Sequence, residues 1–134
     1  MATGIVYLDS SVALRTILDV PQRPRLQAWV DALSGPLVSS RLLRTEMVRV
    51  LRREGRPLDQ ADALLTRTGL LDITRETHTV AESIGPHVRT LDAMHLATAL
   101  LVGEPVTVAT HDTSMMSVAR DLGLAVTDPV ADLS

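Results

Sequence analysis

The sequence predicts an α/β domain with a central parallel sheet of four to five short strands and helices on both faces. Short apolar runs such as Ile5–Leu8 and Val106–Ala109 are typical of strands buried on both faces. Segments with helical periodicity lie between these runs, and this alternation favours parallel pairing through helical crossovers. Because the 134 residues contain no linker, internal repeat or low-complexity tract, we expect a single domain over residues 1–134.

Glycine and proline divide the first half of the chain into its elements. Pro24 suits the first turn of a helix, where the missing amide hydrogen would have no helical partner. Ser40 is expected to cap a further helix, which Gly55 and Pro57 stop. The predicted elements are, in order, a strand at 5–8, helices at 12–18 and 24–33, a strand at 37–39, and helices at 41–53 and 59–68.

The second half continues the alternation. Gly85-Pro86 breaks the chain before TLDAMHLATALL, residues 90–101, in which nearly every residue is apolar or small. Thr90 is the expected N-cap of this helix, which ends near Gly103. The other predicted elements are a strand at 70–73, a helix at 76–84, a strand at 106–109, a helix at 113–122 and a strand at 124–126.

Composition excludes several kinds of chemistry. The chain has no cysteine, which excludes disulfides, zinc–thiolate sites and cysteine nucleophiles. All 13 Lys-or-Arg positions are arginine, so Schiff-base chemistry and a P-loop lysine are excluded as well. No apolar run approaches the roughly 18 residues that cross a bilayer, and the N-terminus lacks a secretion signal. We therefore expect a cytoplasmic protein that does not enter a membrane.

Four acidic residues occupy positions where parallel α/β folds place their sites. Asp9 directly follows the first predicted strand, and Asp112 lies shortly after a later one; ligands of open α/β sheets bind beyond such strand ends. Asp92 is in the first turn of its helix, where the helix dipole favours an anion, and Glu46 lies at the edge of an apolar helix face. Each residue alone also has a structural explanation, as a helix cap, as a dipole partner or, for Glu46, as an ion pair with Arg49.

Converging carboxylates need a cation. Two carboxylates about 4 Å apart repel by ~4 kcal/mol at an effective dielectric of 20, and a divalent ion relieves this repulsion. Oxygen ligands of this kind suit Mg²⁺ or Mn²⁺ and not zinc. Such an ion activates water, orients a phosphodiester and stabilises the leaving oxygen. The pattern therefore favours metal-dependent phosphodiester hydrolysis.

Four segments, in order along the chain, resemble the PIN-domain nucleases and, among them, the VapC-type toxins of bacterial toxin–antitoxin pairs. They are IVYLDSSVAL, SSRLLRTEMVRVLRR, LDAMHLATAL and VTVATHDTSM, which contain Asp9, Glu46, Asp92 and Asp112. The resemblance implies a PIN-like fold in which these four residues bind Mg²⁺, or Mn²⁺, and cleave RNA endonucleolytically. It also implies a homodimer and a cognate antitoxin that covers the site. Many relatives carry an acidic or aromatic residue just after the last aspartate, whereas this chain has Thr113-Ser114-Met115, so a second metal stays open.

Small hydroxyl residues and arginines are the candidates for substrate contacts. The resemblance implies that Ser10 or Ser11, together with Thr110, assists the site by hydrogen bonding. Arg49 and Arg53 lie on the helix of the glutamate and are candidates for holding RNA phosphates. The chain has one Trp and one Tyr, so a stacking platform for bases is not expected.

Two other functions fit parts of the pattern. A non-catalytic domain that binds a partner protein would use the acids as helix caps. An acidic-pocket phosphotransfer protein, such as a phosphatase or a receiver domain, would also place aspartate at strand ends. It typically needs a lysine, however, and the phosphatases need a second aspartate two residues after the first, whereas this chain has Asp9-Ser10-Ser11 and no lysine. His95, one turn after Asp92, either supports the site or packs beneath it.

Overall fold

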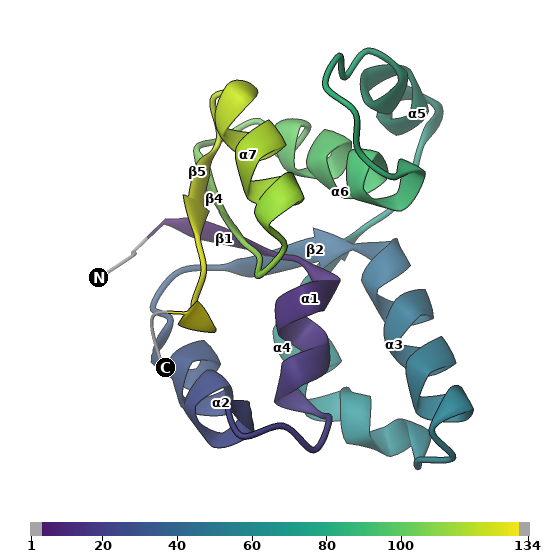
Figure 1. Cartoon of the computed structure of the whole chain (residues 1–134), viewed down its shortest axis with the longest axis vertical. Helices are drawn as coiled ribbons and strands as arrows, with labels where there is room; N and C mark the ends of the chain where they lie inside the picture. Colours follow the sequence, from purple (N-terminus) through teal and green to yellow (C-terminus); the bar gives the residue numbers. More distant parts are fainter. Residues whose placement is uncertain (1–3, 132–134) are drawn as a thin grey trace.

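The structure is a computed structural model that describes residues 4–131, in which one parallel sheet lies between two layers of helices (Figure 1). The strands are β1 (Ile5–Leu8), β2 (Leu37–Ser40), β3 (Gly69–Leu71), β4 (Val106–Ala109) and β5 (Ala125–Thr127). The α-helices are α1 (Ser10–Ala13), α2 (Arg23–Ala32), α3 (Arg41–Arg53), α4 (Asp62–Arg67), α5 (Arg75–Glu82), α6 (Thr90–Leu100) and α7 (Thr113–Asp121). Two 3₁₀ helices are η1 (Leu14–Thr16) and η2 (Leu58–Ala61). The predicted fold class is confirmed.

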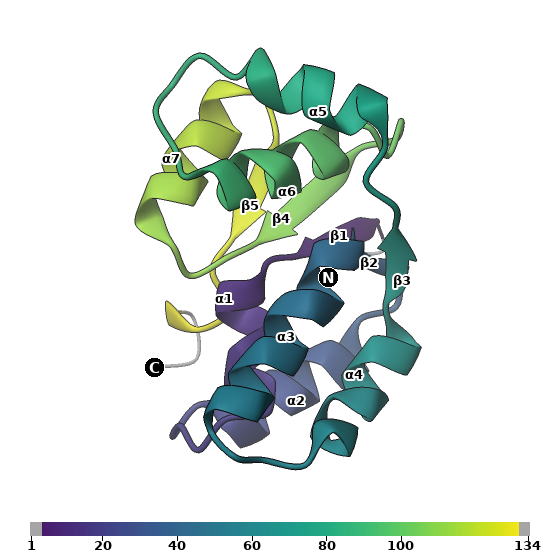
Figure 2. The same ribbon diagram turned by 90° about the vertical axis from the view of Figure 1, so that its right-hand side faces the viewer.

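The strand order is β3-β2-β1-β4-β5, with β1 at the centre. Helices α1 to α4 cover one face of the sheet and α5 to α7 cover the other (Figures 1 and 2). The crossover from β1 leads to the first face and the crossover from β4 to the second, so the chain diverges between two neighbouring strands. Such a divergence opens a crevice at the carboxyl ends of the two strands. The residues that directly follow β1 and β4 at these strand ends are Asp9 and Thr110, and both are buried.

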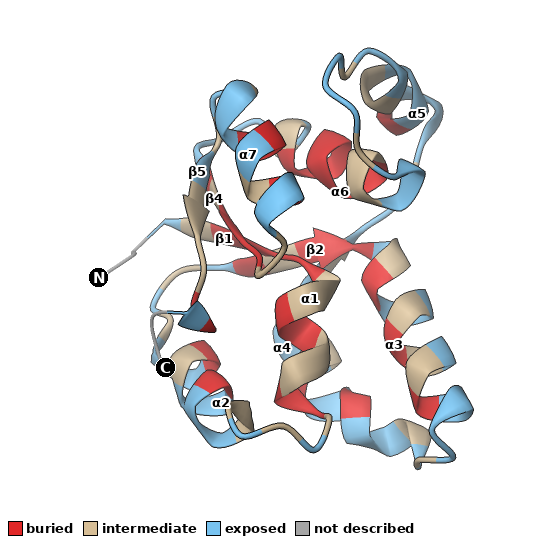
Figure 3. Cartoon of the chain, in the orientation of Figure 1, coloured by how far each residue is buried: buried red, intermediate tan, exposed pale blue. Residues whose placement is uncertain are grey.

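Successive side chains of β1 point to opposite faces of the sheet and so belong to two separate parts of the core. Val6 and Leu8 pack with the first helical layer, while Tyr7 points to the opposite face and packs with Ala99 and Val108. Buried residues line the sheet and the sides of the helices that face it (Figure 3). The central strand is therefore covered on both faces, as its uninterrupted apolar sequence predicts.

Helix α6 is buried over six consecutive residues, Met94 to Ala99. It packs against β2 and β4 on one side and against α5 on another. A helix covered on several sides needs apolar residues all round, which accounts for the sequence TLDAMHLATALL. None of the helices within residues 4–131 combines the length and apolar character that a membrane span requires.

Four features of the elements differ from the predictions. The helix expected at 12–18 ends at Ala13 and continues as η1, where the Thr16 hydroxyl donates to the Ala13 carbonyl and competes with a helical bond. The strand expected at 70–73 is shorter, and the helix expected at 59–68 begins as η2. The prediction that Thr90 caps α6 is wrong, because Arg89 holds the N-cap position and no side chain caps the helix.

Candidate active site

Three of the four predicted acids converge where β1 and β4 end. Asp9 follows β1, Asp112 precedes α7, and Asp92 is in the first turn of α6. The Arg89 guanidinium joins two of them: Nε donates to Asp92 Oδ2 over 3.0 Å and Nη2 donates to Asp112 Oδ2 over 3.2 Å. The negative charge of Asp9 is close enough to act on both Arg89 and Asp92. The crevice therefore holds three carboxylates around one cationic side chain.

The Asp9 carboxylate is buried, with only 2% of the residue exposed. Its Oδ2 atom accepts hydrogen bonds from the Ser11 hydroxyl at 2.7 Å and the Thr110 hydroxyl at 2.8 Å. Its Oδ1 atom is buried and accepts no hydrogen bond within residues 4–131. Although Asp9 holds the N-cap position of α1, its side chain makes no capping bond. Ser10 does not bond to this carboxylate within the described chain, so Ser11 is the serine that supports it.

Ser11 and Thr110 also join the turns that follow the two strands. The Ser11 hydroxyl accepts from the His111 amide at 2.9 Å, and the Thr110 hydroxyl accepts from the Asp112 amide at 3.1 Å. Each hydroxyl therefore receives one hydrogen bond and donates another to Asp9, which fixes the direction of both donors. These four hydrogen bonds hold the Oδ2 atom of Asp9 in place.

Asp112 uses its two oxygens differently. Oδ1 caps α7 by accepting from the amides of Ser114 at 2.9 Å and Met115 at 3.1 Å. Oδ2 faces Arg89. The structural explanation of this residue as a helix cap is therefore correct for one oxygen, and the other remains available to the crevice.

The pKa of the Asp92 carboxyl is raised above its ordinary value, mainly by burial. The hydrogen bond and charge of Arg89 oppose this rise, while the negative charges of Asp9 and Asp112 add to it. Arg89 responds in the opposite sense, because its hydrogen bond to Asp92 and the neighbouring carboxylates raise the pKa of the guanidinium. The crevice carries more negative charge than one arginine balances.

Glu46 contacts a buried histidine, and no hydrogen bond or ion pair within residues 4–131 joins it to the three converging aspartates. His95, fully buried in α6, lies 2.6 Å from Glu46 Oε1 through Nε2 and 2.6 Å from the Tyr7 hydroxyl through Nδ1. Burial raises the pKa of Tyr7, so the phenol keeps its proton. Nε2 faces the Glu46 carboxylate, which can only accept, and therefore donates to it. His95 thus packs in the core and holds the Glu46 carboxylate.

The arginines predicted to contact substrate lie on the outer surface of α3. Arg49 and Arg53 are both exposed, and no ion pair joins Arg49 to Glu46 within residues 4–131. Arg56 differs from them, because it donates to Asp19 at 2.6 Å and so ties the end of the α3 region to the loop after η1. Arg56 therefore does not continue the exposed arginine surface of α3.

Sequence reasoning missed Arg89 and Asp128. Arg89 could have been noticed because a cation beside the first turn of a helix opposes the helix dipole. Asp128 lies after β5, where its carboxylate contacts His111 Nδ1 at 3.0 Å and accepts from the Val130 and Ala131 amides. It anchors His111 at the edge of the crevice.

A divalent cation fits this set of residues in its chemistry. Asp9 Oδ1 is the strongest indication, because a buried carboxylate oxygen without a partner is costly and rare. Within residues 4–131, no three His, Asp or Glu side chains already stand in an arrangement that would hold one ion. Arg89 accounts for part of this, because it engages Oδ2 of both Asp92 and Asp112.

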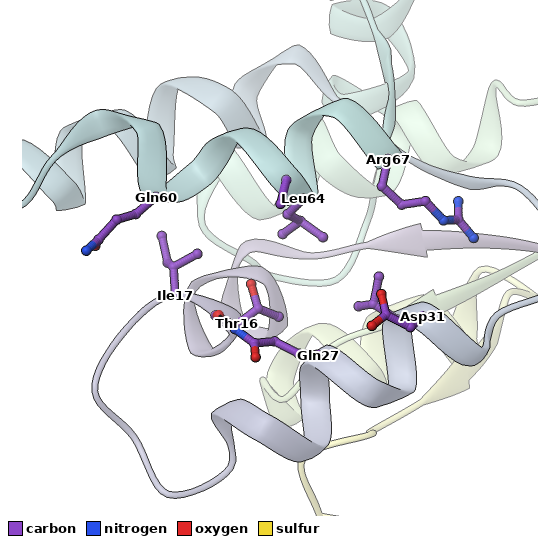
Figure 4. A pocket seen from close by; sticks show the side chains of 9 residues that line it. Thr16, Ile17, Gln27, Asp31, Gln60, Leu64 and Arg67 are labelled. Atoms are coloured by element: carbon purple, nitrogen blue, oxygen red, sulfur yellow. Dashed lines mark hydrogen bonds between the residues drawn. The ribbon is translucent and has the colours of Figure 1, made fainter.

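A separate hollow of about 290 Å³ lies between η1, α2 and α4 (Figure 4). Ile17 and Leu64 form apolar parts of its wall, and Gln27, Asp31 and Arg67 supply polar groups. None of the four acids lines it. The four predicted acids therefore lie apart from this hollow.

Comparison with known proteins gives concordant matches. The model of the PIN domain family matches residues 6–121. Ribonuclease VapC47 of Mycobacterium tuberculosis is 33% identical over 134 residues, which cover 95% of this chain and 98% of that protein. Among solved structures, VapBC2 from Rickettsia felis, bound to a DNA fragment from its promoter, has a TM-score of 0.69 at 13% identity and covers 92% of this chain and 97% of its own. VapC20 of M. tuberculosis, described as a toxin that cleaves the sarcin–ricin loop, has a TM-score of 0.69 at 13% identity, with coverage of 84% and 93%.

Proposed function

This chain belongs to the PIN-domain family, and from this membership we propose that it is an endoribonuclease acting as the toxin of a toxin–antitoxin pair. The observation that carries the proposal is the convergence of Asp9, Asp92 and Asp112 at the divergence of β1 and β4, in a chain whose relatives are named ribonucleases. Family membership removes the reason for the acidic-pocket phosphotransfer alternative. The unpartnered oxygen of Asp9 argues against acids that serve only as caps.

The proposed cofactor is Mg²⁺, with Mn²⁺ as its substitute. Asp9, Asp92 and Asp112 would hold the ion, and Glu46 would hold a second ion or orient the attacking water. When bound, the ion supplies an activated water and stabilises the leaving oxygen of the cleaved phosphodiester. The proposal is supported by the buried oxygen of Asp9 and by the excess of negative charge in the crevice.

The chain's own residues prepare the carboxylates to bind an ion. Ser11 and Thr110 hold Oδ2 of Asp9 and leave Oδ1 unengaged. His95 holds Oε1 of Glu46 while the second carboxylate oxygen stays without a bond from the ring. Side chains fixed by such secondary hydrogen bonds lose less freedom when they bind a ligand.

We infer that RNA lies across the crevice with its backbone against α3. The exposed arginines of this helix are Arg41, Arg44, Arg49, Arg52 and Arg53. Contacts of this kind are to phosphates, so RNA affinity should fall as salt rises. With one Trp and one Tyr in the chain, and Tyr7 buried, recognition depends on backbone and shape and not on stacked bases.

The partner is an antitoxin protein, in keeping with the similarity to VapBC2 and to a protein described as a toxin. We further propose that the chain forms a homodimer, as the family resemblance implies. Light scattering on the purified protein, alone and with the product of an adjacent antitoxin gene, measures both associations. A monomer at all concentrations would contradict the dimer and leave the nuclease activity to be judged separately.

The experiment that tests the nuclease proposal is RNA cleavage by purified protein with Mg²⁺, with EDTA and with substitutions at the site. Asp9→Asn and Asp92→Asn should each lower the cleavage rate by more than about 100-fold, because each removes a proposed metal ligand. Glu104→Gln is the matched control, since Glu104 is an exposed acid in the turn before β4. Full cleavage by both aspartate variants, or undiminished cleavage in EDTA, would contradict the proposal.

A further inference from the structure

Arg89 supplies the positive charge inside the acidic crevice. Its guanidinium bonds to carboxylates from two different helices, Asp92 of α6 and Asp112 of α7. The two carboxylates are largely shielded, with 14% and 26% of their side chains exposed, whereas 78% of the Arg89 side chain is exposed. The arginine therefore covers the acids from the solvent side of the crevice.

Without Asp92 and Asp112, the position of Arg89 would be electrostatically unfavourable. It is the N-cap residue of α6, it makes no side-chain capping bond, and the dipoles of α6 and α7 both present positive ends to this region. Aspartate, serine or threonine would serve a helix start better. The ion pairs with Asp92 and Asp112 therefore explain why an arginine occupies this position.

Arg89 and a divalent ion would require the same atoms. The guanidinium engages Oδ2 of Asp92 and Oδ2 of Asp112, and no three acidic or histidine side chains within residues 4–131 already form an ion-holding group. An ion that takes these carboxylates neutralises the charge that holds Arg89. The guanidinium must then find another anion or return to water.

We propose that Arg89 exchanges partners during the reaction, bonding to Asp92 and Asp112 before metal binds and to a phosphate of the RNA afterwards. This inference rests on the proposed function. A guanidinium presents a planar pair of N–H donors that matches phosphate as well as carboxylate. Because the side chain is exposed and already lies at the crevice, it reaches the backbone of a strand bound there. Arg89 is in this way both a competitor of the metal and a substrate-binding residue.

The first arm of the test measures metal binding without RNA. The probe is Mn²⁺, counted by the electron paramagnetic resonance signal of the free ion, with wild type, Arg89→Gln, Arg89→Lys and Arg75→Gln. Arg75→Gln is the matched control, because Arg75 is exposed at the start of α5 and its replacement removes the same charge. Arg89→Gln should bind Mn²⁺ about threefold or more tightly than Arg75→Gln, since a competing cation is gone. Arg89→Lys keeps the charge but loses the paired donors, and its affinity should lie between those of wild type and Arg89→Gln.

The second arm measures binding of a mixed-sequence 20-nucleotide RNA at saturating Mg²⁺, on ice, with the RNA shown to be intact on a gel. Arg89→Gln should weaken binding and lower the slope of log affinity against log salt by about 0.7, the value for one phosphate contact on a single strand. A residue with only a structural role would not strengthen metal binding while it weakens RNA binding.

The outcomes separate this inference from the proposed function. Wild-type protein that binds Mn²⁺ and cleaves RNA, with Arg89→Gln indistinguishable from Arg75→Gln in either arm, would overturn the exchange and leave the nuclease intact. Protein in which neither wild type nor Arg89→Gln binds Mn²⁺ would overturn both. Opposite changes in the two arms support the exchange.

Discussion

Replacing His95 with leucine should destabilise the protein by about 3 kcal/mol. The fully buried ring makes two hydrogen bonds of 2.6 Å, one to the Tyr7 hydroxyl and one to Glu46. A neutral bond contributes about 1 kcal/mol and a bond to a charged group about 1.5–3 kcal/mol. The leucine would remove one partner of the buried phenol, which Ser39, Thr98 and the Ser40 backbone also contact, and the glutamate, 23% exposed, would turn to water. For a chain of this length the loss corresponds to a fall in Tm of about 10 °C.

Urea unfolding followed by the fluorescence of Trp29 measures this loss, because Trp29 is the single tryptophan and packs against the core. A double-mutant cycle with Tyr7→Phe isolates the buried bond. The double variant lacks the hydroxyl that His95→Leu deprives of its ring partner, so its loss should be smaller than the sum of the single losses by about 1–2 kcal/mol. His78→Leu, on the exposed side of α5, is the control and should change stability by less than about 0.5 kcal/mol. A loss below about 0.5 kcal/mol for His95→Leu, or strict additivity in the cycle, would refute the hydrogen-bonded chain.

Two further substitutions test separate features by thermal unfolding. Ser40→Ala should lower stability by about 1 kcal/mol, because the Ser40 hydroxyl caps α3 by accepting from the Leu42 amide; Thr90→Ala, at a position that caps nothing, should lie within about 0.5 kcal/mol of wild type. In EDTA at pH 7, Asp92→Asn should be more stable than wild type, because the raised pKa of Asp92 means that its charge opposes folding. This advantage should shrink as the pH falls through the folded-state pKa and vanish near pH 3, below the ordinary aspartate pKa of about 3.9, where the carboxyl is protonated in both the folded and the unfolded state. Equal losses of stability for Ser40→Ala and Thr90→Ala would contradict the capping assignment. An advantage of Asp92→Asn that is the same at both pH values would contradict the assignment of its charge.

The sequence predicts the strands well because each is a short apolar run with a sharp end. Asp9 and Asp112 follow from the same logic, since a parallel sheet brings such ends to one edge. The partners of these acids do not follow from local pattern. Arg89 breaks the rule for helix starts, and only the folded chain shows that it lies beside Asp112, 23 residues away.

Histidine at position 95 shows a second limit of prediction. Spacing alone places His95 one turn after Asp92, which leaves open whether it supports the site or packs beneath it. Its actual partners are a tyrosine on the central strand, 88 residues earlier, and a glutamate on α3. Burial and hydrogen-bond geometry, which depend on the packing of α6 between the sheet and α5, decide among these roles.

The hydrogen bonds that hold the Asp9 carboxylate join residues that are made at different times during synthesis of the chain. Thr110, which holds Asp9 from a distance of 101 residues in sequence, and Asp112 both follow β4, which lies beside the central strand. A chain that has been translated only through its first hundred residues therefore contains Asp9 and Asp92 but neither Thr110 nor Asp112. The Asp9 carboxylate therefore gains its Thr110 hydrogen bond only once β4 is available to pair with β1.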